Sequence, residues 1–242
     1  MIPLGDTVPS KTFPFINYFL VAANVFFFLI ELAQGPYLDK FIQSYGVVPY
    51  HFKVMFRPEM NVFDYVYFKY FPLLSSLFLH GGWFHLGGNM LFLWIFGDNV
   101  EDRLGHVRYL FFYLFCGIAA SAAHIVMNFN STIPSIGASG AIAGVLGAYL
   151  LLYPWARVRT LIIIFIFIDI IEIPAYLFIF FWFLIQLFSS FGSIMASPNA
   201  GGVAWFAHIG GFIAGFITVN IVKKRQKPRR LPRFQRFERH PW

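Results

Sequence analysis

A serine between glycines opens one of the apolar segments of this sequence, in the order Gly137-Ala138-Ser139-Gly140. A serine at the start of a helix is commonly an N-cap, whose hydroxyl accepts a hydrogen bond from the backbone. It could instead be a nucleophile, because an anionic oxygen there meets free N–H groups and the positive end of the helix dipole. The glycines would let a substrate backbone approach closely. These four residues alone leave both interpretations open.

A histidine, His208, falls inside a second apolar segment. A histidine at membrane depth is costly, which makes it a candidate functional residue by default. Gly211 and Gly215 follow it at a spacing that lets another helix pack very close. Gly140 and further glycines recur at helical spacing after Ser139. The two glycine faces would therefore bring His208 beside Ser139.

A third polar cluster lies in the segment HGGWFHLGGNM, which holds His80, His85 and Asn89. His85 and Asn89 are four residues apart, so they share a helix face, and both can donate hydrogen bonds. Near a serine, two such donors could stabilise the oxyanion of an acyl-transfer reaction. His80 could brace the preceding loop. The alternatives are polar contacts between buried helices and a metal site with His208, which lacks an evident acidic or thiolate partner.

These clusters belong to a chain whose composition is that of a membrane protein, with 58% hydrophobic and only 12% charged residues. Soluble domains have about 45–50% apolar and about 25% charged residues. Because a spanning helix needs about 20 apolar residues, we predict an all-α bundle of six transmembrane helices. The predicted spans are 14–33, 83–101, 107–127, 138–153, 175–195 and 203–222, which together make one membrane domain over 1–222.

Two connections need separate interpretation. Residues 34–82 are rich in proline and aromatic residues, which predicts a long first loop at the membrane interface. Residues 160–173 are apolar but too short to cross, and Asp169 and Glu172 interrupt them. We expect this second segment to be an interfacial or re-entrant connection leading into the fifth helix.

Charge sets the predicted orientation. Nine of the 18 Lys and Arg residues fall between Lys223 and Arg239, directly after the last apolar segment. We expect 223–242 to be a cytoplasmic tail that touches anionic lipid, rather than an arm that binds nucleic acid. Six spans then place the N-terminus in the cytoplasm as well. Ser139 and His208 both fall near the outer side, although the lysines of the first loop oppose this orientation.

Taken together, the three segments resemble the rhomboid family of intramembrane serine proteases, in the family's order and on the expected helices. Residues 96–105, FGDNVEDRLG, also resemble the family's turn after the second helix, with Glu101 in a structural role. The resemblance implies Ser139 as nucleophile and His208 as general base, without a third carboxylate. It implies His85 and Asn89 as oxyanion donors, helped by backbone N–H groups of Ala138 and Ser139.

The resemblance further implies transmembrane protein substrates, a bacterial inner membrane and no cofactor. The chain departs from the family pattern at Phe71-Pro72, where members often have Trp-Arg, and at Ala143, where some members stack a tyrosine against the histidine. The support of His208 must then come from elsewhere. The rival interpretations are a catalytically silent rhomboid-like protein that binds membrane clients, and a small transporter, for which no inverted repeat is evident.

Overall fold

The computed structural model describes residues 2–53, 61–164, 167–195 and 204–223. Its longer helices fall one in each predicted range, and they are α1 (Phe15–Ala33), α5 (Trp83–Leu104), α6 (His106–Met127), α7 (Ser139–Leu152), α8 (Ala175–Met195) and α9 (Trp205–Val222). Of these, α1, α6 and α9 are long and apolar enough to cross a membrane, whereas α7 and the described part of α8 are shorter apolar helices. The chain is thus a mostly helical membrane protein. The predicted tail, apart from Lys223, lies outside the described residues, as do residues 196–203.

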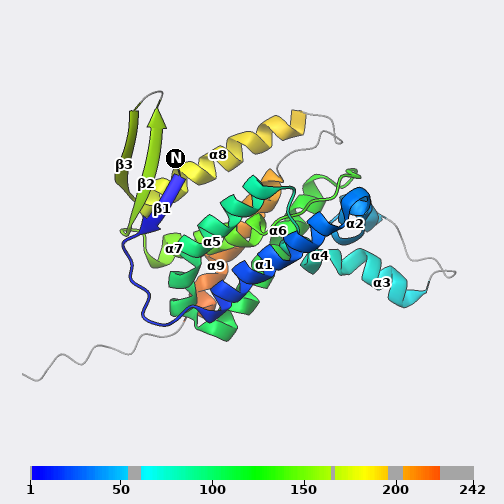
Figure 1. The fold of residues 1–242 in the computed structure, drawn as a ribbon, viewed down its shortest axis with the longest axis horizontal. Coiled ribbons are helices and arrows are strands. Elements are labelled where there is room, and N and C mark those ends of the chain that lie inside the picture. The colour runs from blue at the N-terminus through cyan, green and yellow to red at the C-terminus, as the bar shows by residue number, and fades with distance from the viewer. Residues whose placement is uncertain (1, 54–60, 165–166, 196–203, 224–242) are drawn as a thin grey trace, which may run out of the picture.

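Helix α9 packs against α6 and α7 (Figure 1). Glycines make this position possible. A Cβ at Gly211 would overlap the carbonyl oxygen of Gly140, and a Cβ at Gly215 would overlap that of Gly144. The backbones of α7 and α9 therefore touch directly, as small residues allow between membrane helices.

Polar contacts tie α1 to its neighbours. The fully buried carboxylate of Glu101, on α5, accepts hydrogen bonds from the N–H groups of Ile16 and Asn17 at 3.0 and 2.7 Å. These amides lie in the first turn of α1, which has no intrahelical partners for them, and a negative charge is favourable there. The Asn17 amide then donates to the Leu93 carbonyl and accepts from the Tyr109 hydroxyl, which joins α1 to α5 and α6.

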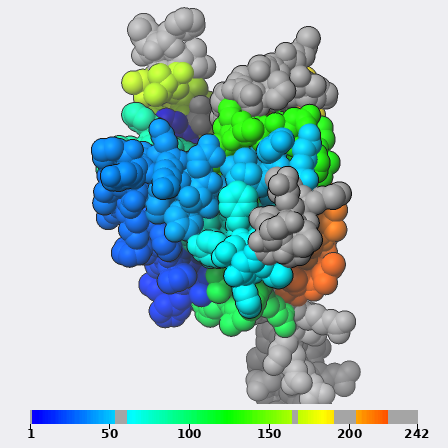
Figure 2. Space-filling view, turned by 90° about the vertical axis from the view of Figure 1, so that its right-hand side faces the viewer, coloured from blue at the N-terminus to red at the C-terminus, as the bar shows by residue number. Residues whose placement is uncertain are grey.

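The first connection consists of short helical pieces: η1 (Gly35–Tyr37), α2 (Leu38–Tyr45), η2 (Pro49–Lys53), α3 (Val62–Tyr70), α4 (Pro72–Ser75) and η3 (Ser76–Phe78). Figure 2 shows these residues, blue to cyan, spread over one end of the molecule. Val47 exchanges backbone hydrogen bonds with Ser135, and the Gly137 N–H donates to the Ser76 carbonyl at 2.9 Å. The connection thereby holds the segment that leads into Ser139.

Pro72 is buried at the first position of α4, where its missing N–H costs nothing. The ring of Phe71 stacks on that of Tyr67, with centroids 4.7 Å apart. Aromatic packing is thus one contact that holds this end of the loop, at the position where Trp-Arg would be expected.

Residues 160–173 lead into α8, as expected, but they are strands, so the all-α class is wrong in this part of the chain. Strands β2 (Arg157–Ile164) and β3 (Phe167–Pro174) form an antiparallel hairpin, and β1 (Ile2–Asp6) pairs with β2 to give the order β1-β2-β3. The isoleucine-rich composition favours strands. The inner face of the sheet, with Val158 and Thr160 fully buried, packs against the rest of the chain. Because the outer face is apolar as well, the sequence shows a continuous apolar run and not the alternation typical of a strand.

Strand β1 also reaches the helices. The Asp6 carboxylate accepts hydrogen bonds from the Tyr149 hydroxyl of α7 and from the Asn99 amide of α5. Burial raises the pKa of Asp6 to about 6, against the opposing effect of the Tyr149 hydrogen bond. The sheet is therefore attached to the end of α7 that lies opposite Ser139.

The contact between α7 and α9 generates a stability prediction. Gly215→Ala should destabilise the protein by about 1–3 kcal/mol, because the added methyl overlaps backbone rather than a movable side chain. Gly87→Ala on α5 is the matched control, since a Cβ there meets nothing within 4 Å. Thermal unfolding in detergent, followed by circular dichroism, compares the two. Equal melting temperatures would contradict direct backbone contact.

Candidate active site

Ser139 and His208 form a hydrogen bond, with 2.7 Å between the serine Oγ and the histidine Nε2. Ser139 is the first residue of α7, and Ala138 occupies the N-cap position without any side-chain cap. The N-cap interpretation of Ser139 is therefore wrong, because its hydroxyl is directed at His208. The glycine contact between α7 and α9 brings the two residues together from 69 positions apart.

The other ring nitrogen of His208 bonds to Gln186 on α8, at 2.7 Å between Nδ1 and Oε1. The Gln186 Nε2 in turn donates to the Trp182 carbonyl at 3.0 Å. Because that carbonyl can only accept, the amide oxygen of Gln186 must face His208 and accept from it. His208 therefore carries its proton on Nδ1, which leaves the Nε2 lone pair free to receive the serine proton.

Gln186 supplies the support for His208 that Ala143 cannot give, at the position where some members of the resembled family have a tyrosine. Gln186 and His208 are both buried, at 5% and 8% exposure. The rings of Trp182 and Trp205 both lie near the imidazole, each with its centroid 6.0 Å away. Sequence reasoning missed Gln186, although a lone amide inside a Phe-rich segment was a usable signal.

His85 faces the same place from α5. Its Nδ1 accepts the Gly81 N–H at 3.2 Å, so its Nε2 carries the proton and can donate. A Cβ on Gly137 would lie 2.8 Å from that Nε2 and 3.6 Å from the Ser139 Oγ. The space beside Gly137 thus lies between the serine and a hydrogen-bond donor. A side chain at 137 would fill it, and the φ of +125° there also favours glycine.

Further donor groups lie on the same two helices, α5 and α7. The Nδ2 of Asn89, one turn after His85, is buried and has no hydrogen-bond partner among the described residues. Ala138 and Ser139 lie at the start of α7, where backbone N–H groups have no intrahelical partner. A small pocket, lined in part by Ser76, Gly137 and Ser139, opens beside the serine. The arrangement can activate a hydroxyl and stabilise a negative oxygen next to it.

His80 braces its loop through the backbone, not through its ring. Its N–H donates to both carboxylate oxygens of Glu31, in the last turns of α1, at 3.1 and 3.0 Å. The ring is 2% exposed and lies edge-on to that of His85, with centroids 5.1 Å apart. Glu31 was not singled out in the sequence. Within the described residues no group of three or more His, Cys, Asp or Glu side chains could hold a metal ion.

Comparisons with known proteins point to one family. A family model described as Rhomboid domain matches residues 67–225. The chain is 29% identical over 219 residues to rhomboid protein 1, mitochondrial, of Saccharomyces cerevisiae, covering 87% of this chain and 55% of that protein. It is 33% identical over 204 residues to the rhomboid protease GluP of Bacillus subtilis, covering 84% of this chain and 34% of the relative.

A third relative is the chloroplastic rhomboid-like protein 11 of Arabidopsis thaliana, 30% identical over 148 residues, which cover 59% of this chain and 48% of that protein. The chain thus spans about half or less of the length of these relatives.

The hydrogen bond to Gln186 generates a prediction about the reactivity of Ser139. Gln186→Leu removes the acceptor and leaves the buried Nδ1–H unsatisfied, at a cost of about 1–3 kcal/mol. The rate at which a fluorophosphonate probe labels Ser139 should therefore fall at least about fivefold. Gln186→Glu keeps an acceptor and should label faster than the leucine variant.

Phe188→Leu, at an exposed position of the same helix, is the control for general perturbation of α8. Unchanged labelling of Gln186→Leu, with normal thermal unfolding, would show that Gln186 does not hold the histidine.

Proposed function

The chain belongs to the rhomboid family, and from this premise we propose that it is an intramembrane serine endopeptidase with a Ser139–His208 dyad. Its substrates are proteins with transmembrane segments, cut in or near the membrane. The observation that carries the proposal is the hydrogen bond from Ser139 to His208, continued to Gln186, beside a space bordered by hydrogen-bond donors.

The reaction follows from these contacts. Ser139 Oγ attacks the substrate carbonyl carbon while its proton moves to Nε2 of His208. The carbonyl oxygen, now negative, lies in the space beside Gly137 and accepts from His85, Asn89 and the amides of Ala138 and Ser139. His208 then gives the proton to the leaving amine. Water hydrolyses the acyl-serine by the same steps, which restores Ser139.

The histidine works here without a carboxylate. In its charged form His208 keeps the Nδ1–H bond to Gln186, whose amide oxygen is a neutral acceptor. A neutral acceptor holds the ring in place. A carboxylate in its position would be an unpaired charge at membrane depth whenever His208 is neutral. Gln186 is a positioning residue in this scheme, because it acts through His208 and not on the substrate.

The proposed topology has six spans, with α5, α7 and α8 crossing in addition to α1, α6 and α9. Residues 1–222 form the membrane domain, and the basic tail 223–242 and the N-terminus lie in the cytoplasm. Ser139 then starts a short helix from the outer side, where water can reach polar groups that line a cavity. We place the protein in a bacterial inner (cell) membrane, as for a bacterial relative such as that from Bacillus subtilis, while other relatives are mitochondrial or chloroplastic.

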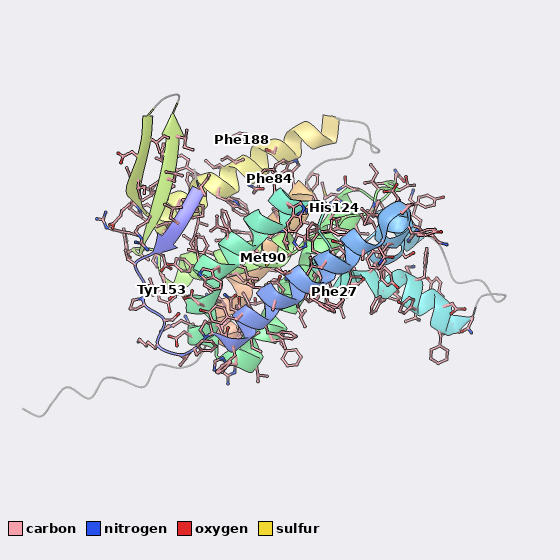
Figure 3. All side chains as sticks on the ribbon, in the orientation of Figure 1. Phe27, Phe84, Met90, His124, Tyr153 and Phe188 are labelled. Atoms are coloured by element: carbon pink, nitrogen blue, oxygen red, sulfur yellow. The ribbon has the colours of Figure 1, made fainter. Side chains whose placement is uncertain are left out.

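A transmembrane substrate needs a route from the side. Helices α5 and α8 touch near the start of α8, where Phe178 lies against Phe92 and Phe96. Further along α8, Phe181 and Phe188 are exposed, at 48% and 68%. Figure 3 shows Phe188 on α8 and Phe27 on α1 at opposite edges of the bundle. We assign the α8 side as the entry route, with an unwound substrate backbone at Ser139.

Cleavage tests the proposal directly. In vesicles that contain a single-span test substrate, Ser139→Ala and His208→Ala should reduce cleavage to background, because each removes the nucleophile or its base. Gel analysis of the products compares the variants with the unchanged chain. Equal cleavage by all three proteins would contradict the proposed dyad, and no cleavage by the unchanged chain across several substrates would favour a silent protein that binds membrane clients.

The oxyanion donors give a second prediction. Asn89→Ala should lower kcat by about 10²–10³ with little change in KM, because the donor acts on charge that develops in the transition state. Asn220→Ala, at an exposed position of α9, is the matched control. An increase in KM alone would show that Asn89 binds the substrate without stabilising the oxyanion.

A further inference from the structure

The three-stranded sheet has an apolar face that no described residue covers. Paired residues of neighbouring strands share a face, and β2 pairs Ile163 with Ile168, Leu161 with Ile170, and Leu161 with Ile2 of β1. This outer face of the sheet (Ile2, Leu161, Ile163, Ile168, Ile170) alternates with the buried inner face. Ile163, Ile168 and Ile170 are 57%, 69% and 56% exposed.

The base of the same hairpin is polar and aromatic. Arg157 and Arg159 are both exposed, and Arg157 lies 3.9 Å from Glu172. Trp155, just before β2, is 80% exposed and lies edge-on to Tyr176. Exposed isoleucines beyond a base of arginine and tryptophan are the pattern of a surface that lies in a membrane interface.

The position of the hairpin agrees with this pattern. Strand β3 ends at Pro174 and α8 begins at Ala175, so the sheet continues directly into an apolar helix. Figure 1 shows the hairpin projecting sideways from the end of the bundle where α8 begins. The helix that follows the sheet also has exposed apolar side chains, such as Phe180 and Phe181.

The depth of such a contact is limited by the backbone. Strand β3 is an edge strand, and half of its backbone groups have no partner in the sheet. Unpaired N–H and C=O groups are not tolerated in hydrocarbon but find water and headgroups in the interface. The backbone thus belongs at headgroup level, with the isoleucine side chains directed into the acyl boundary.

We propose that the outer face of the sheet is an anchor on the cytoplasmic leaflet, with its isoleucines in the acyl boundary and Arg157 and Arg159 at anionic headgroups. The arginines attract anionic lipid, and the apolar side chains leave water. The anchor fixes the start of α8, the helix that carries Gln186. This role depends on the membrane placement of the chain and not on peptidase activity.

Collision measurements on a spin label test the anchor. The full chain with Ile168→Cys, carrying a nitroxide, is placed in vesicles of phosphatidylcholine and phosphatidylglycerol. The label should meet oxygen, which concentrates in lipid, more often than a water-soluble nickel chelate. The oxygen-to-nickel ratio should be several-fold above that of Lys11→Cys, an exposed position before α1, and close to that of Phe188→Cys on α8.

The unsubstituted chain is the labelling blank, because its one cysteine, Cys116, is buried. A ratio at Ile168 equal to that at Lys11 would overturn the proposal, since the outer face would then lie in water. Exclusion of both reagents, with spectral broadening between labels, would also overturn it, because the free edge of β3 would then be covered by a second copy of the chain. The labels report depth whether or not the protein cleaves substrate.

Discussion

Direct backbone contact between α7 and α9 is the constraint on which the site depends. Ser139 on α7 and His208 on α9 are joined by a hydrogen bond of 2.7 Å. Gly211 and Gly215 remove the side chains that would separate the helices, and the carbonyls of Gly140 and Gly144 occupy the space. In lipid, where apolar side chains gain little by leaving the solvent, such close packing is a main source of helix association. The same contact thus stabilises the bundle and aligns serine with histidine.

Much of this arrangement could be predicted from local sequence patterns. Helix ranges could be predicted because apolar runs of membrane length are strong signals, and glycine spacing indicated which helices meet. The hairpin could not, because its isoleucines read equally well as a membrane segment, and its third strand comes from residues about 150 positions earlier. The partners of His208 and His80 were missed for a related reason. Gln186 and Glu31 lie 22 and 49 residues from the groups they bond, and neither belongs to a local motif.

Neutral polar groups and buried carboxylates bind different partners in this bundle. The histidine is held by an amide, whereas the carboxylates of Glu31 and Glu101 bind backbone N–H groups. Glu101 bonds the beginning of α1, and Glu31, near the end of α1, bonds the segment just before α5. Two carboxylate-to-amide contacts therefore join α1 and α5 near both ends. His85 and Asn89 project from the start of this doubly joined pair.

His208, the proposed base, depends by contrast on a helix that is joined to the bundle by fewer contacts. Gln186 lies on α8, which packs mainly against α7, α9 and the sheet and meets α5 near its own start through Phe178. If α8 swings outward to admit a substrate, Gln186 leaves His208, and the proton is no longer held on Nδ1. In the proposed mechanism, Ser139 would then lose its hydrogen-bonded base for as long as the bundle stays open. Entry and hydrolysis would exclude each other in time, so the bundle would have to close on a substrate before cutting it. The hydrogen bond to Gln186 is in this sense an interlock, which makes a short-lived encounter with a passing helix harmless.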